Sequence, residues 1–144
     1  LKEYLNSNRP FLGICLGLQA LFEYSEEAPD IRGLGLIAGS VKRFDIDLSV
    51  PHIGWNGIRV QQPTDLFDGL DGDEKFYFVH SFHVVSEDET TILTTTDYGY
   101  SFVSAIQKGD RSIRTCYAMI EAAVTRSTRP GDRDSGTKTV LPTS

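Results

Sequence analysis

The sequence has little of several residue types on which whole classes of protein depend. Its 144 residues include two cysteines, Cys15 and Cys116, too few for a disulfide framework and typical of a reducing compartment. No basic cluster with interleaved aromatic residues is present, and the net charge of −6 disfavours a nucleic-acid partner. No apolar run is long enough to span a membrane, and the N-terminus has no signal or transit pattern. We therefore expect that neither a membrane nor a nucleic acid is a partner of this chain.

The chain begins at Leu1 rather than at methionine, so we expect that its natural start lies upstream. We predict a cytoplasmic location, with a plastid as the alternative if a transit peptide has been lost. No metal and no cofactor are expected.

The composition is that of an ordinary globular chain, 40% hydrophobic and 24% charged, and long enough for one domain with a buried core. Acidic side chains outnumber basic ones over residues 1–110, whereas basic ones prevail over residues 111–144. The last twenty residues are mostly Gly, Pro, Ser and Thr. We therefore predict a partial domain over residues 1–110 and a divergent, largely disordered tail over residues 111–144.

Apolar patterning predicts more strands than helices, and hence a mixed α/β sheet protein. Residues 11–15 are short and apolar enough for a strand covered on both faces, and residues 19–25 follow it as a helix with a core stripe of Leu18, Leu21 and Phe22. Residues 50–57 are too rich in Pro and Gly for regular structure, and residues 112–124 could form a short helix. Further strands are expected over residues 40–44, 58–60, 75–79, 90–96 and 102–107, with a capped helical turn over residues 64–67 and the end of a helix over residues 1–7.

The most informative stretch is the segment of residues 10–19, in which Gly13 and Gly17 bracket Cys15. This G-x-C-x-G pattern is the thiol counterpart of the G-x-S-x-G nucleophile elbow, a sharp strand-to-helix turn. Glycines two residues to either side would remove side chains that clash at such a turn. A position at a helix N-terminus would favour the thiolate of Cys15, and the backbone N–H of Leu16 would be free to hold an oxyanion. A lone cysteine in an apolar run is, however, more often a buried small hydrophobe.

The segment of residues 10–19, P-F-L-G-I-C-L-G-L-Q, resembles the nucleophile segment of class I, triad-type glutamine amidotransferases. Four further segments match in order, at residues 26–37, 50–56, 76–82 and 97–106. The second and third of these, V-P-H-I-G-W-N and F-Y-F-V-H-S-F, are similar to signatures of one branch, the glutaminase part of imidazole glycerol phosphate synthase. The resemblance covers roughly residues 1–110.

This resemblance implies a flavodoxin-like α/β fold, a three-layer sandwich with a mixed, mostly parallel sheet. The fold is expected to be incomplete, because such a sheet normally has strands before the nucleophile strand. The implied function is glutamine hydrolysis in histidine biosynthesis, with ammonia passed to a cyclase that is a TIM-barrel subunit or a fused domain. Glutamine and the cyclase are the implied partners.

The resemblance also implies a role for individual residues. Cys15 would attack the side-chain amide of glutamine, and the backbone of Leu16 would form half of the oxyanion hole. The substrate would be held by Gly17, Gln19, Glu27, His80, Ser81 and Phe82. The cyclase would be met by Pro51, His52, Ile53, Gly54, Trp55 and Asn56. Taken singly, His52 and His80 could be structural, Trp55 an ordinary aromatic anchor and Glu27 part of a solvated helix end.

One departure from the family pattern concerns the catalytic base. An unperturbed cysteine is only a few per cent thiolate at pH 7, so it needs a histidine oriented by a carboxylate. The family supplies this pair in a late H-P-E segment, but here no histidine follows His83. We therefore expect this chain to be inactive as a glutaminase. The alternatives are another class I amidotransferase, of the anthranilate or guanylate type, and a non-catalytic interaction module derived from the fold.

Overall fold

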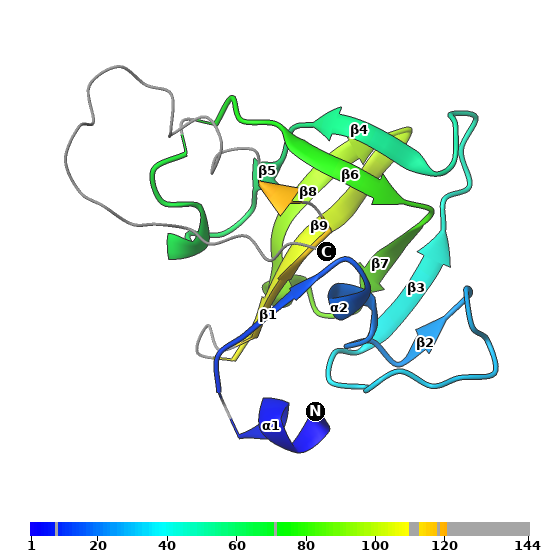
Figure 1. Ribbon diagram of the computed structural model, residues 1–144, viewed down its shortest axis with the longest axis vertical. Coiled ribbons are helices and arrows are strands. Elements are labelled where there is room, and N and C mark those ends of the chain that lie inside the picture. The colour runs from blue at the N-terminus through cyan, green and yellow to red at the C-terminus, as the bar shows by residue number, and fades with distance from the viewer. Residues whose placement is uncertain (8, 71, 110–112, 118, 121–144) are drawn as a thin grey trace, which may run out of the picture.

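Two sheets and a few short helices make up the part of the chain that the computed structural model describes, which is residues 1–7, 9–70, 72–109, 113–117 and 119–120 (Figure 1). The helices are α1 (Lys2–Asn6), α2 (Leu16–Gln19) and the 3-10 helices η1 (Asp65–Phe67) and η2 (Glu89–Thr91). The strands are β1 (Phe11–Ile14), β2 (Tyr24–Ser25), β3 (Gly39–Arg43), β4 (His52–Asn56), β5 (Arg59–Val60), β6 (Phe76–His80), β7 (Phe82–Ser86), β8 (Ile92–Tyr98), β9 (Tyr100–Lys108), β10 (Ile113–Cys116) and β11 (Met119–Ile120). None of these helices is long and apolar enough to cross a membrane.

The larger sheet has the order β1-β10-β9-β7-β3-β2, with β8 paired to β9 and β5 to β8, and the smaller sheet has the order β11-β6-β4. The predicted mixed sheet is confirmed. Within the described residues, however, only β1/β10 and β2/β3 pair in parallel, and the other pairings are antiparallel. Short connections account for some of these, such as the pair β8/β9, because a tight turn allows only antiparallel pairing. The predicted excess of parallel pairs is therefore absent from this part of the chain.

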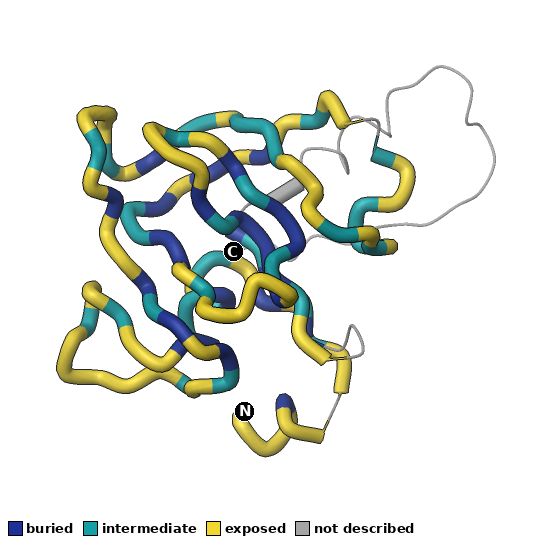
Figure 2. Tube along the Cα trace, turned by 180° about the vertical axis from the view of Figure 1, so that it is seen from behind, coloured by how far each residue is buried: buried dark blue, intermediate teal, exposed yellow. Residues whose placement is uncertain are grey.

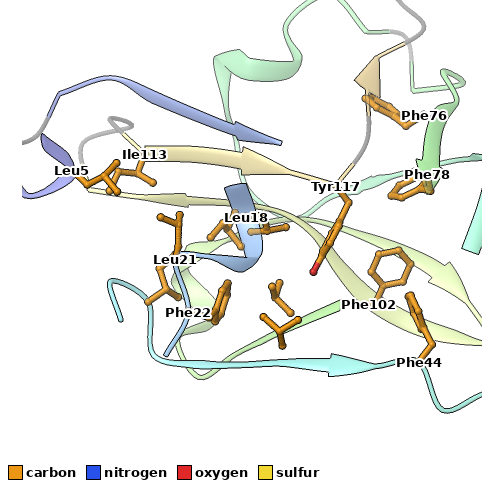
Figure 3. Close-up of a cluster of buried hydrophobic side chains, with 14 residues drawn as sticks. Leu5, Leu18, Leu21, Phe22, Phe44, Phe76, Phe78, Phe102, Ile113 and Tyr117 are labelled. Carbon is orange, nitrogen blue, oxygen red and sulfur yellow. The ribbon is translucent and has the colours of Figure 1, made fainter. Parts of the chain in front are cut away.

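The core lies between the larger sheet and the segment that follows Cys15 (Figure 3). Leu18, Leu21 and Phe22 are fully buried, so the predicted apolar stripe is confirmed. The predicted helix over residues 19–25 is wrong, because α2 ends at Gln19 and β2 begins at Tyr24. The loop at residues 33–36 takes the backbone carbonyls that a longer helix would need, with Leu34 N donating to Ala20 O and Gly35 N to Phe22 O.

Two further segments, residues 50–57 and residues 112–124, differ from the sequence predictions. The segment expected to be irregular, residues 50–57, contains strand β4. Pro51 lies just before the strand and does not interrupt it, and Gly54 is accommodated within it at φ = 142°. The described part of residues 112–124 forms strands β10 and β11 rather than a helix, because β10 is paired on both sides, to β1 and to β9. Residues 121–144, where most of the predicted disordered tail falls, lie outside the described residues.

Strand β1 is half covered rather than buried on both faces. Gly13 is buried, whereas the side chains of Leu12 and Ile14 are 59% and 44% exposed in the described structure. Figure 2 shows the buried positions gathered in the strands, and exposed positions in α1 and the outer loops. Cys15 therefore follows a strand that is supported from one face and from its β10 edge.

Candidate active site

Cys15 occupies a strained corner between β1 and α2. Its backbone has φ = 52° and ψ = −102°, and within the described residues no other non-glycine residue has a positive φ. The corner is held by hydrogen bonds from Cys15 N to Cys116 O (2.8 Å) and from Leu18 N to Cys15 O (3.0 Å). Strained backbone of this kind is concentrated at functional sites and costs about 1–3 kcal/mol. The strand-to-helix turn predicted for the G-x-C-x-G motif is therefore present.

The two glycines of the motif are not equivalent. A Cβ atom on Gly13 would lie 2.6 Å from Thr115 Cγ2 and 2.9 Å from the carbonyl carbon of Gly17, so a side chain does not fit there. A Cβ atom on Gly17 would meet no described atom within 4 Å, and its φ is not positive. Only Gly13 is thus required by the packing around the corner.

The thiol of Cys15 does not have the activated character that its place before a helix suggested. Burial raises its pKa above the ordinary value, and the Glu27 carboxylate raises it further. The Leu16 backbone amide interacts with the thiol and lowers the pKa, but burial is the larger effect. Helix α2 has only four residues, so its dipole contributes little. In this structure the thiol form is therefore favoured over the thiolate.

A pocket of about 460 Å³ opens beside Cys15. Its lining comes from four separate parts of the chain: Cys15, Leu16, Gln19, Glu27, Pro51, Val79, His80, Ser81 and Phe82. The carboxylate of the neighbouring Glu26 instead accepts a hydrogen bond from Arg43 N (2.8 Å), so of the acidic pair only Glu27 lines the pocket. Nearly all residues expected to hold a substrate are thus brought together, and Gly17 alone of them is not part of the lining.

The turn between β6 and β7 forms one wall of the pocket. His80 Nδ1 lies 2.7 Å from Phe82 O, and Ser81 O accepts a hydrogen bond from Phe44 N (3.0 Å). The other ring nitrogen of His80 lies 3.3 Å from His52 Nδ1. Burial lowers the pKa of His80 to about 4, so this ring is neutral at pH 7. Because both its nitrogens are engaged, His80 is not poised to accept a proton from Cys15.

Sequence reasoning missed Tyr117, which lies directly after β10. Its ring stacks on that of His80 at 4.4 Å and is buried, and Figure 3 shows its hydroxyl pointing into the core cluster. Burial raises the pKa of this phenol well above its ordinary value, while the nearby Gln19 side chain acts in the opposite direction. Ile113, Thr115 and Tyr117 recur at every second position, a spacing that is typical of a strand with one buried face. The change of composition after residue 110 argued instead for a tail without a buried face.

Of the residues that were expected to meet a partner, only some have exposed side chains on β4. Its outer face exposes Ile53 (58%) and Trp55 (53%) beside Val79 (52%) and Tyr77 (37%) of β6, their partners in register. The Trp55 and Tyr77 rings lie 5.1 Å apart, edge to face. We call these four residues the β4–β6 apolar face. The sequence analysis did not identify Tyr77 and Val79 as surface residues. They lie there because successive side chains of β6 point to opposite faces, with Phe76 and Phe78 buried.

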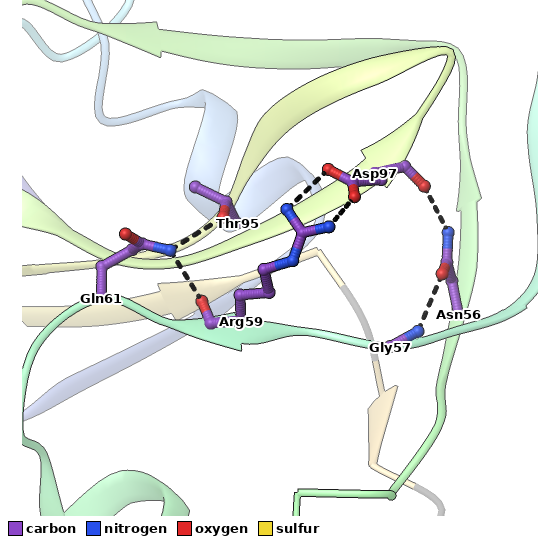
Figure 4. A network of polar contacts seen from close by, with 6 residues as sticks. All are labelled: Asn56, Gly57, Arg59, Gln61, Thr95 and Asp97. Carbon is purple, nitrogen blue, oxygen red and sulfur yellow. Dashed lines mark hydrogen bonds and ion pairs between the residues drawn. The ribbon is translucent and has the colours of Figure 1, made fainter.

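Three of the remaining residues of this set, Pro51, His52 and Asn56, contact other parts of the same chain or line its pocket. His52 is buried, and Pro51 lines the pocket. Asn56 donates from Nδ2 to Asp97 O (2.8 Å) and accepts from Gly57 N (2.8 Å), while Arg59 forms an ion pair with the Asp97 carboxylate (Figure 4). Asn56 thus ties the end of β4 to β8.

Comparison with known proteins identifies the family. The model of the family described as glutamine amidotransferase class-I matches residues 1–116. The chain belongs to the class I glutamine amidotransferases. The match extends through β10 and therefore beyond residue 110, where the sequence analysis placed the end of the amidotransferase domain.

Named relatives of this amidotransferase chain are similar over most of its length. It is 50% identical over 111 residues (72% of this chain, 54% of the relative) to the imidazole glycerol phosphate synthase subunit HisH of Syntrophotalea carbinolica. It is 46% identical over 107 residues (74% and 52%) to that of Aquifex aeolicus. It is also 46% identical over 114 residues (76% and 19%) to the chloroplastic imidazole glycerol phosphate synthase hisHF of Arabidopsis thaliana. The chain spans about half the length of the HisH subunits that it matches.

A solved structure supports the fold. The crystal structure of a Thermoplasma acidophilum protein assigned to GMP synthase superimposes with a TM-score of 0.56 at 20% identity. The superposition covers 81% of this chain and 51% of that one. The class I amidotransferase fold expected from the sequence is thus confirmed.

Proposed function

We propose that this chain carries the nucleophile and substrate pocket of a glutaminase of the imidazole glycerol phosphate synthase type, which acts in histidine biosynthesis. The observation that carries the proposal is the pocket that unites the strained Cys15 with Gln19, Glu27 and the turn at residues 80–82. The similarity to named HisH subunits at 46–50% identity supports this branch of the family over the anthranilate and guanylate types.

The pocket has the groups that a free amino acid requires. The Cys15 sulfur would attack the side-chain amide carbon of glutamine to form a thioester, the C–N bond would break, and the proton lost by the thiol would leave with the amide nitrogen as ammonia. The Leu16 N–H would donate to the oxyanion that forms during the attack. The Glu27 carboxylate is suited to the α-ammonium group, while Gln19 and the backbone at Ser81 and Phe82 offer hydrogen bonds to the carboxylate end.

We propose that this chain lacks glutaminase activity by itself, because the described residues place no available base beside Cys15. No histidine follows His83, and His80, which lines the pocket, has both ring nitrogens engaged. The raised pKa of Cys15 agrees with a thiol that lacks a basic neighbour. By analogy with triad deletions, the expected deficit is at least about a thousandfold.

We further propose that the β4–β6 apolar face meets the cyclase that consumes the ammonia. Four contiguous exposed apolar side chains with an aromatic pair at one end are typical of a protein interface. The cyclase is a separate subunit or a fused domain, and the name hisHF of the Arabidopsis relative supports the fused alternative. We propose a cytoplasmic location, with a plastid as the alternative that the chloroplastic relative supports.

The test measures ammonia release from glutamine by the full chain, with and without a HisF-type cyclase, beside labelling of Cys15 by a glutamine-shaped diazoketone. We expect ammonia release at background level and selective labelling of Cys15, blocked by excess glutamine. Cyclase binding should weaken when Trp55→Ala is introduced, with Tyr24→Ala, an exposed aromatic away from this face, as the control. Labelling that glutamine does not slow would contradict a glutamine pocket.

A second candidate is a non-catalytic module that retains the fold and binds the cyclase. The raised thiol pKa and the engaged His80 favour it. It predicts binding of the cyclase with no selective labelling of Cys15, so the same two measurements separate the candidates.

A further inference from the structure

Two buried imidazoles lie side by side on neighbouring strands of the smaller sheet. His52 of β4 and His80 of β6 are partners in register, and their side chains are 3% and 5% exposed. His52 Nδ1 lies 3.3 Å from His80 Nε2. Two polar groups buried this deeply need a defined donor and acceptor, because an unpaired one costs about 1–3 kcal/mol.

The contacts of His80 determine where the protons are. Phe82 O can only accept, so His80 Nδ1, 2.7 Å away, carries the hydrogen. Burial keeps the ring neutral at pH 7, which leaves Nε2 as an acceptor. His52 Nδ1 must therefore carry the hydrogen that is donated to His80. Both rings are thus in the Nδ1–H tautomer.

Packing holds both rings in this arrangement. The His52 ring stacks on Tyr98 (3.9 Å, 19°) and on Phe78 (4.9 Å, 17°). The His80 ring stacks on Tyr117. A rotation of either ring out of its plane would lose a stacked neighbour. A 180° flip within the plane would put a carbon in place of each hydrogen-bonding nitrogen, so stacking and hydrogen bonds together fix the proton order.

The chain of hydrogen bonds ends at the pocket wall. His80 fixes the carbonyl of Phe82, and Phe44 N fixes that of Ser81, so both peptide groups of this turn are oriented from inside the protein. We propose that His52 is a positioning residue of the pocket: it holds His80 in the tautomer that orients the Ser81–Phe82 backbone toward the ligand. This inference rests on the proposed function in that the ligand is glutamine.

Two substitutions of His52 separate positioning from packing. His52→Phe keeps a ring between Tyr98 and Phe78 but removes the donor. His52→Asn keeps an amide donor near the Nδ1 position but loses most of the stacking. A purely structural role therefore predicts that His52→Asn loses more of the pocket's preference for a glutamine-shaped ligand. A positioning role predicts that His52→Phe loses more of this preference.

The first measurement compares the rates at which Cys15 of the full chain is alkylated by a glutamine-shaped diazoketone and by iodoacetamide. The ratio of the two rates cancels changes in the thiolate fraction. Loss of one hydrogen bond predicts a fall of about three- to tenfold in this ratio for His52→Phe, and a ratio within about twofold of the wild type for His52→Asn. An unchanged ratio in His52→Phe, or the reverse order of the two variants, would overturn the inference.

The second measurement does not depend on glutamine. Long-range 1H–15N spectra at pH 7 should show His52 and His80 as Nδ1–H tautomers, and His52→Phe should shift the amide resonances of Ser81 and Phe82. An Nε2–H tautomer at His80, or unshifted amides, would overturn the inference. If the wild-type chain shows no preference for the diazoketone, the proposed function fails, while the tautomer and the amide shifts still decide the role of His52.

Discussion

At the scale of single residues, the geometry of a nucleophile and its activation are separable. Cys15 has the strained backbone of an elbow, and the register of β1 with β10 maintains it. Its thiol is nevertheless partly buried and lies near the Glu27 carboxylate, and both effects raise the pKa and disfavour the thiolate. The corner is thus specified by local packing, whereas activation requires a positive neighbour that the described residues do not place there.

The corner predicts unequal effects of alanine at its two glycines. Gly13→Ala forces a Cβ atom to within 2.6 Å of Thr115 Cγ2, and overpacking of this kind costs about 1–3 kcal/mol of unfolding free energy. Gly17→Ala introduces a methyl group into open space within a helix and should be neutral or slightly stabilising. Urea denaturation of the two variants measures the difference. Equal midpoints would show that Gly13 is not packed as described.

The environment of the thiol predicts how its reactivity responds to charge. Glu27→Gln removes a negative charge that raises the pKa of Cys15, so the pKa should fall toward its ordinary value. It should remain raised in part, since burial is the larger cause. The pH dependence of Cys15 alkylation, followed by mass spectrometry of its peptide, gives both values. The distant Glu89→Gln serves as the control, and an equal shift in that variant would exclude a local effect.

At the scale of elements, the sequence predicts strands well where aromatic and β-branched residues are dense and poorly where Pro and Gly interrupt them. Density of this kind predicts the strand at residues 75–79, whereas Pro51 and Gly54, which are typical of irregular loops, hide β4. What makes β4 a strand is its full antiparallel register with β6, a tertiary interaction that local propensity does not contain. The resemblance to amidotransferase motifs, by contrast, indicates Cys15, Gln19, Glu27 and residues 80–82, which the structure brings to one pocket. Their roles in binding stay predictions.

The polar contacts at the end of β4 predict which of two neighbouring side chains stabilises the element. Asn56→Ala removes one donor and one acceptor that satisfy backbone groups and should cost about 1 kcal/mol or more of unfolding free energy. Arg59→Ala removes an ion pair whose side chains are 65% and 50% exposed, and it should cost less than about 1 kcal/mol. Denaturant midpoints at low and high salt test this order, since only the Arg59 effect should shrink with salt. A larger loss in Arg59→Ala would contradict it.

At the scale of the whole molecule, the histidines join elements that are far apart in the sequence. Phe44, directly after β3, lies against the rings of His52, His80 and His83, which come from β4, β6 and β7. His83 Nε2 accepts from or donates to Tyr100 Oη at 2.7 Å on β9. This aromatic cluster connects the two sheets behind the pocket. Nothing in the sequence places three histidines in one cluster, because their proximity depends on strand order rather than on spacing.

The histidine cluster predicts that the folded chain is destabilised by mild acid. Burial lowers the pKa of His80 to about 4 in the folded chain, against 6.5 for an exposed histidine, and it lowers the pKa values of His52 and His83 as well. Between these two values the unfolded chain binds more protons than the folded one, so stability falls as the pH drops from 6.5 toward 4. His80 alone accounts for on the order of 3 kcal/mol over that window. Urea midpoints from pH 7.5 to 4.5 measure this slope, and His80→Asn, which retains an amide donor for Phe82 O, should flatten it. A stability that is independent of pH between 7 and 5 in the wild-type chain would show that these rings take up protons in the folded chain over the same pH range as in the unfolded chain.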